Sequence, residues 1–85
     1  MTISDRDAFA HRGYQQAQDT AVRYAFAHRG EPYAVYFDGK DLSVRHANAV
    51  PPRCARCVCV ARHHINDSVK LTFANHEKIV RFSAS

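Results

Sequence analysis

Residues 50–64, with the sequence VPPRCARCVCVARHH, constrain the fold more than any other part of the chain, because they hold all three cysteines and two of the three prolines. Residues 57–61 are apolar without interruption, and Pro51 and Pro52 precede them. A short apolar run between turn signals is typical of a buried strand, although a buried helical turn has the same pattern. Cysteine and β-branched valine at this density favour a strand. We therefore expect a central strand here.

The N-terminal third of the chain predicts helix. Ser4 with Asp7 three residues later has capping-box spacing, which predicts a helix from Asp5. Small and aromatic side chains then recur at helical spacing over residues 14–29, as expected for an amphipathic helix that packs closely on a sheet. Gly13 either divides this region into two helices or is tolerated within one.

The hexapeptide AFAHRG occurs twice, at residues 8–13 and 25–30. Two copies are too few for a solenoid, whose repeats must stack at least about three deep. His and Arg complement the negative end of a helix dipole, and glycine is the usual residue after a helix. The repeat therefore predicts two helix ends of the same chemistry, and a paired function of His11 and His28 is the weaker interpretation.

The rest of the chain predicts strands and turns. Asp38 and Gly39 mark a hairpin turn, and the segment from Val69 onwards alternates apolar and polar residues. The expected strands are residues 33–37, 42–47, the cysteine strand, 69–74 and 78–83, and residues 83–85 are expected to fray.

These elements predict an α+β fold, with an N-terminal helix or helix pair packed on one face of a small, mostly antiparallel sheet of about five strands. A chain of 85 residues has room for one domain, residues 1–85, with a modest core that a homodimer or a larger partner would help to stabilise. An odd number of cysteines and the lack of a signal peptide or membrane-spanning run predict a cytoplasmic protein with reduced thiols and no membrane association.

Twelve Lys and Arg against eight Asp and Glu give a net charge of +4. Strand alternation places several cations on the sheet face away from the helix, where they predict a basic binding face. Its members are Arg45, Arg56, Arg62, Lys70 and Arg81, with Arg53 and Lys78 nearby. Such a face suits an acidic protein surface or a phosphate backbone. The alternative is a solvated face whose charges prevent strands of different molecules from pairing.

The pair Cys54 and Cys57 has the spacing of a metal clasp, and Cys59 with His63 or His64 would complete four ligands. Structural zinc sites usually take two such clasps, and this chain offers one. Strand alternation also predicts that Cys57 and Cys59 point the same way and Cys54 the other. The favoured interpretation is therefore that the three cysteines are free thiols and that the protein binds no cofactor. A redox dithiol would need a helix N-terminus at Cys54, and a cysteine nucleophile would need an oxyanion hole.

No catalytic motif is recognised, so the sequence predicts a binding protein and not an enzyme. The specific expectation is a stoichiometric inhibitor or accessory factor of phage or mobile-element type, acting on a larger protein or nucleoprotein complex, for example an anti-CRISPR-type inhibitor of host defence. The alternative is a basic nucleic-acid-binding module, with or without a zinc staple. The predicted binding residues are Arg45, Arg53, Arg56, Arg62, Lys70 and Arg81, of which Arg45, Arg56, Arg62 and Lys70 would bind phosphates in the nucleic-acid alternative.

Overall fold

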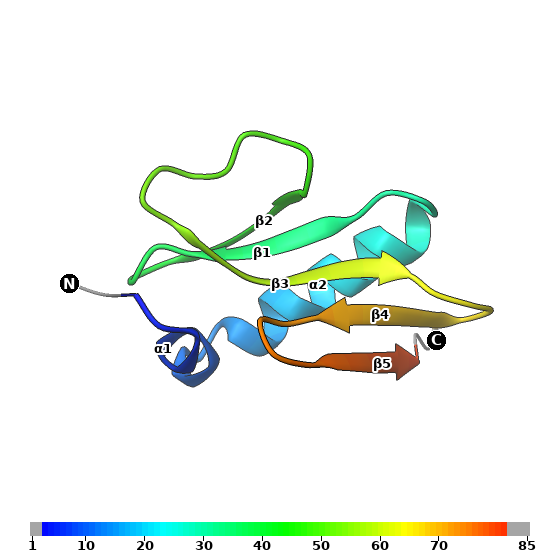
Figure 1. The fold of residues 1–85 in the computed structure, drawn as a ribbon, viewed down its shortest axis with the longest axis horizontal. Coiled ribbons are helices and arrows are strands. Elements are labelled where there is room, and N and C mark those ends of the chain that lie inside the picture. The colour runs from blue at the N-terminus through cyan, green and yellow to red at the C-terminus, as the bar shows by residue number, and fades with distance from the viewer. Residues whose placement is uncertain (1–2, 82–85) are drawn as a thin grey trace.

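The computed structural model describes residues 3–81, and it has the expected α+β architecture. Two helices precede five strands, which form one antiparallel sheet in the order β2-β1-β3-β4-β5 (Figure 1). The elements are α1 (Asp5–Ala10), α2 (Tyr14–Ala27), β1 (Tyr33–Phe37), β2 (Leu42–His46), β3 (Arg56–His63), β4 (Ser68–Thr72) and β5 (Glu77–Arg81). The prediction for residues 82–85 lies outside the described residues.

The helical region consists of two helices because the chain turns at His11 and Gly13. The backbone N–H of Gly13 donates to Nδ1 of His11 at 2.9 Å, so Nε2 carries the ring proton and donates to the carbonyl of Lys40 at 2.9 Å. A Cβ at position 13 would lie 3.2 Å from the same Nδ1, which makes a side chain there crowded. Both AFAHRG copies contain a helix end, as expected, since α1 ends at Ala10 and α2 at Ala27. The prediction that the two ends share the same chemistry is wrong, because Gly30 has a positive φ of 88°, whereas Gly13 has a φ of −89° and is the N-cap of α2.

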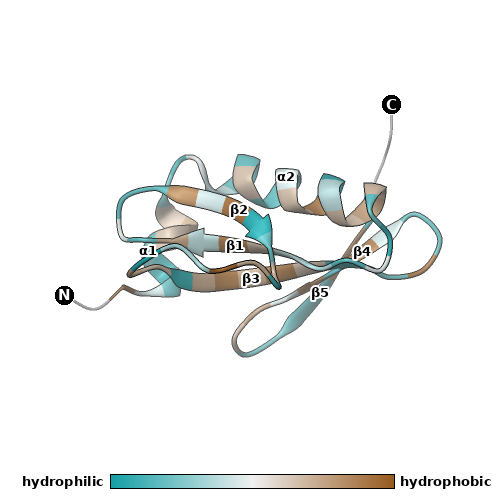
Figure 2. Ribbon diagram, turned by 90° about the horizontal axis from the view of Figure 1, so that it is seen from above, coloured by the Kyte–Doolittle hydropathy of each residue, from teal (hydrophilic) through white to brown (hydrophobic). Residues whose placement is uncertain are grey.

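The longer helix, α2, covers one face of the sheet, as the view from above in Figure 2 shows. Small residues such as Ala21 and Ala25 are fully buried and let the helix approach closely. The core between the helices and the sheet contains Ala8, Tyr14, Ala21, Val22, Ala25, Val35, Phe37, Val58, Cys59, Ala61, Val69 and Leu71. The cysteine strand is thus central, as its apolar run predicts.

A β-bulge in β3 changes which side chains share a face. Val35 pairs with Cys59 but Tyr36 pairs with Cys57, so Val58 is the extra residue between them. Val58 is 2% exposed and belongs to the core. Arg56 and Cys57, the two residues of β3 before the bulge, therefore lie on the faces opposite to those that simple alternation along the strand predicts.

The face of the sheet away from α2, here called the outer face, carries no helix. The connector between β2 and β3 arches beyond the β2 edge of the sheet, and its last part passes β1 on the way into β3 (Figure 1). Ala34 and Tyr36 point to the outer face and are nevertheless buried, at 1% and 8% exposure. The part of the outer face on β3, β4 and β5 stays accessible.

Candidate functional site: the outer face of the sheet

The strand register places four of the six predicted binding residues on the outer face. Arg45 lies on β2, Arg62 on β3, Lys70 on β4 and Arg81 on β5, each next to neighbours that face away from the core. Arg53 is exposed in the connector. Four of the six cations therefore lie on one face of the sheet, as strand alternation predicts, and Arg56 does not.

Arg56 does not belong to the outer face, and its predicted placement is wrong. Because it precedes the bulge, it lies opposite Phe37, on the side that carries the helices. Its Nε is 2.6 Å from the carboxylate of Asp5 in α1, which raises the pKa of the guanidinium. Arg56 thus anchors α1 to the sheet, and the bulge was not visible in the alternation of the sequence.

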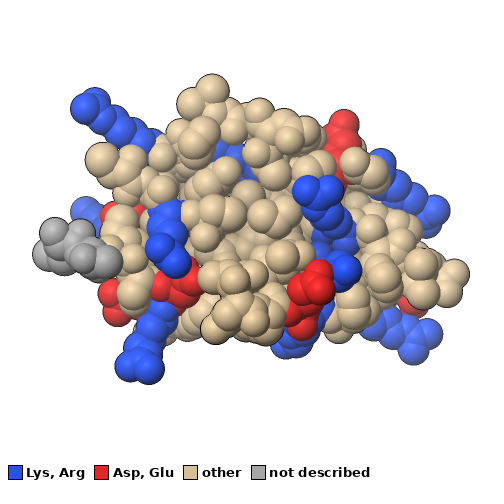
Figure 3. Space-filling view, in the orientation of Figure 1, with Lys and Arg blue, Asp and Glu red and all other residues tan. Residues whose placement is uncertain are grey.

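Carboxylates of the same chain neutralise part of the positive charge on the outer face. Lys70 Nζ lies 3.0 Å from Glu77 Oε2, and Arg81 Nε lies 3.1 Å from Asp67 Oδ2, whose pKa falls because of that bond. Figure 3, which looks onto the outer face, shows Lys and Arg side chains mainly around a largely uncharged centre, with Asp and Glu between them. The surface is a mixed rim of charge and not a continuous cationic stripe.

Arg62 is not neutralised in this way; it is exposed and pairs directly with Lys70 across β3 and β4. Like charges in directly opposed positions of a sheet are destabilising. Lys70 has Glu77 as a counter-ion, but among residues 3–81 Arg62 has no ion pair or side-chain hydrogen bond. Arg62 is therefore a charge that the fold itself does not use.

The predicted zinc ligands are not brought together. Cys57 lies opposite Tyr36 and Cys59 opposite Val35, so the bulge turns them to different faces, contrary to the expectation from alternation. Cys54 is exposed in the connector, and His63 Nε2 bonds to the carbonyl of Asn66 at 3.0 Å. Among the described residues, no group of three or more His, Cys, Asp or Glu side chains is arranged to hold a metal ion.

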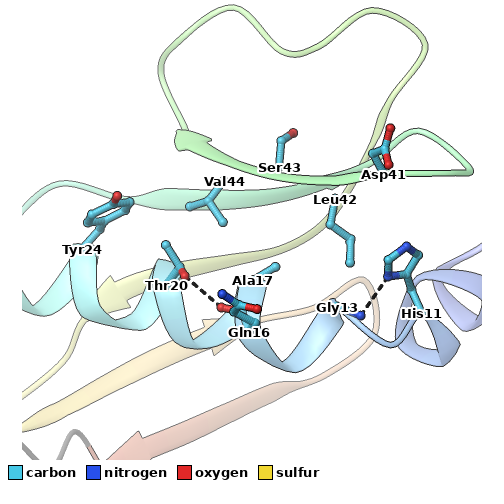
Figure 4. Close-up of a pocket in the computed structure, with 10 residues that line it drawn as sticks. All are labelled: His11, Gly13, Gln16, Ala17, Thr20, Tyr24, Asp41, Leu42, Ser43 and Val44. Atoms are coloured by element: carbon cyan, nitrogen blue, oxygen red, sulfur yellow. Dashed lines mark hydrogen bonds between the residues drawn. The ribbon is translucent and has the colours of Figure 1, made fainter.

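A groove that the sequence analysis did not anticipate runs between α2 and β2 (Figure 4), with a volume of about 490 Å³. Its lining consists of His11, Gly13, Gln16, Ala17, Thr20, Tyr24, Asp41, Leu42, Ser43 and Val44. The spacing of Gly13, Ala17 and Thr20 along α2, one small residue per turn, was the available signal. Both nitrogens of His11 are already hydrogen-bonded, so its ring is not free to act as a general base in this arrangement.

No protein-family model, no curated protein and no solved structure matches the chain. Within the described residues, no helix is both long enough and apolar enough to cross a membrane.

Proposed function

We propose that the protein is a small non-catalytic binding protein, a stoichiometric inhibitor or accessory factor that docks its outer face on an acidic surface of a larger protein or nucleoprotein complex. The pair of Arg62 and Lys70 is the observation that carries this proposal. A carboxylate from a partner placed between the two side chains would remove their repulsion and form charge-assisted hydrogen bonds with both. Sites that bind a partner commonly retain such locally unfavourable arrangements.

The composition of the surrounding surface supports a protein partner ahead of a nucleic acid. Of the predicted cations, Arg56, Lys70 and Arg81 are already paired with carboxylates of the same chain. A phosphate backbone is bound by many unpaired cations, whereas a protein interface combines a few charges at its rim with an apolar centre. The uncharged centre in Figure 3 and the exposed side chain of Ile79 fit the second description.

The test is affinity capture from a lysate of the host cell, with three forms of the protein as bait. The wild type and Arg23→Glu, which makes the same charge change on an exposed position of α2, should retain one partner in stoichiometric amount. Arg62→Glu should lose it. Equal retention by all three forms, or by none, would overturn the proposal.

A parallel measurement separates the nucleic-acid alternative. Fluorescence anisotropy with labelled single- and double-stranded oligonucleotides, at salt concentrations from about 50 to about 200 mM, should show weak binding or none. Tight binding that falls steeply with salt and depends on Arg62 would make the protein a nucleic-acid-binding module instead.

Phage or mobile-element origin, an anti-CRISPR-type action on host defence and a cytoplasmic location stay predictions from the size and composition of the chain. A plaque assay measures the most specific of them. Expression of the protein in a host with an active CRISPR system should restore infection by a targeted phage, and Arg62→Glu should not.

A further inference from the structure

The strand β5 forms an open edge of the sheet. Phe73 N–H donates to His76 O at 2.8 Å, which makes these two residues a hydrogen-bonded pair. Since bonded and non-bonded pairs alternate along an antiparallel ladder, the backbone groups of Glu77, Ile79 and Arg81 point away from β4. β5 is the last strand of the sheet that residues 3–81 form, so within these residues no strand lies beside its outward groups.

The side chains on this edge have a symmetric order of charge. Glu77, Ile79 and Arg81 lie on the outer face, with an acid at one end, a base at the other and a half-exposed isoleucine between them. An antiparallel copy of the same strand, related by a two-fold axis through Ile79, places Glu77 of each chain opposite Arg81 of the other. Ile79 then contacts Ile79 of the second copy, and all outward backbone groups of β5 lie in hydrogen-bonding positions.

Other registers do not have this property. A shift that moves the two-fold axis to Glu77 pairs two glutamates, and a shift that moves it to Arg81 pairs two arginines, which is unfavourable in either case. An axis through Lys78 places Ile79 of one chain opposite Glu77 of the other, and an axis through Val80 places Ile79 opposite Arg81. The charge pattern therefore selects one register and one occupant, a second copy of the same strand.

We propose that the protein forms a homodimer in which the β5 strands of two chains pair antiparallel about Ile79, joining two sheets into one. The outer faces of the two chains then lie on the same side of a continuous sheet, so that Arg62 and Lys70 are presented twice. A partner with a repeated acidic surface would be bound with higher avidity than by one chain. The dimer itself does not depend on the proposed function.

Charge exchange tests the interface. Sedimentation equilibrium of the wild type over a range of concentrations should show a reversible dimer, and Glu77→Arg alone or Arg81→Glu alone should weaken association on the order of tenfold or more, since like charges then face each other. An equimolar mixture of the two variants should form a heterodimer with close to wild-type affinity. The double variant should recover the homodimer.

The mixture and the double variant separate dimerisation from folding. Each single variant also loses an ion pair within its own chain, to Lys70 or Asp67, but that loss cannot be repaired by mixing two chains. Arg45→Glu is the matched control, because it reverses an exposed arginine on β2, the opposite edge strand, and should leave association unchanged. Circular dichroism verifies that every variant is folded.

A cross-link provides a second, geometric readout. Residues of a hydrogen-bonded antiparallel pair have Cα atoms about 5.5 Å apart, which a disulfide spans. Ile79→Cys, in a chain with Cys54→Ser and Cys57→Ser, should form a disulfide-linked dimer on mild oxidation.

A wild type that stays monomeric at all concentrations would overturn the proposal. So would association that is unaffected by both single variants, or association that Arg45→Glu abolishes, which would place the interface on β2. Loss of partner binding with an intact dimer would instead count against the proposed function alone.

Discussion

The hydroxyl oxygen of Tyr14 lies 3.6 Å from Sγ of Cys59, and it donates its proton to Oε1 of Gln18 at 2.9 Å. The thiol therefore donates to the hydroxyl, and a short polar chain runs from α2 to the central strand inside the core. Gln18 is buried, with 8% exposure. Tyr14→Phe removes the donor and leaves Oε1 of Gln18 buried without a partner.

We expect Tyr14→Phe to lower the free energy of unfolding by about 1–3 kcal/mol, the cost of an unpaired buried polar group. Urea denaturation at neutral pH measures it. The double variant with Gln18→Met should recover much of the loss, because both members of the bond are then apolar. Additive losses in the double variant would show that the bond contributes nothing.

The buried side chains of Cys59 and Tyr14 predict that the protein is less stable in alkaline solution. Burial, as the main cause, raises the pKa of Cys59 from 9.0 to about 11, and burial also raises the pKa of Tyr14. A group whose pKa is higher in the folded state stabilises the fold below its unfolded pKa, and that contribution is lost as the pH rises through the folded pKa. The free energy of unfolding should thus fall between about pH 9 and pH 11, by on the order of 2–3 kcal/mol from Cys59.

Urea unfolding at pH 7, 9 and 10 follows this fall, and Cys59→Ala should reduce it. An equal fall in the variant would assign the loss to other groups.

The cysteines should differ in their reaction with a thiol reagent. Cys54 and Cys57 are exposed, whereas Cys59 is 1% exposed. Partial burial of the Cys57 sulfur raises the pKa of this thiol, so less of the reactive thiolate is present at neutral pH. Titration of the native protein with Ellman's reagent should modify Cys54 and Cys57, and Cys59 only after unfolding. Mass spectrometry of digested samples identifies the modified residue, and early labelling of Cys59 would contradict its burial.

Two charge reversals on the same strand should have opposite effects on stability. Arg62→Glu replaces a like-charge pair with an opposite-charge pair to Lys70, so we expect an unchanged or slightly higher melting temperature. Arg56→Glu places a carboxylate next to Asp5, so we expect the melting temperature to fall by a few degrees.

Thermal unfolding followed by circular dichroism compares these two variants with the wild type. If Arg62→Glu destabilises the protein as much as Arg56→Glu does, Arg62 has a structural role, and its use as a binding residue loses its support.

Local patterns predicted most of the secondary structure. The hairpin signal at Asp38 and Gly39 lies between β1 and β2, and Gly39 has the positive φ of 97° that favours glycine. The alternation from Val69 predicted that Val69 and Leu71 are buried, and both are. These features depend on residues close in sequence, so composition and spacing are enough to find them. The sequence does not decide between one helix and two, because the turn at His11 includes a hydrogen bond to Lys40, which is distant in sequence.

The sequence by itself determined the fold class, the central position of the cysteine strand and most of the cations on the outer face, since each follows from the periodicity of one segment. Only the tertiary structure decided where Arg56 and Cys57 point, because the bulge at Val58 arises from the pairing of β3 with β1. It also decided which cations stay unpaired and which strands lie at the edges of the sheet. Those properties depend on which segments become neighbours, and the periodicity of a single segment does not contain that information.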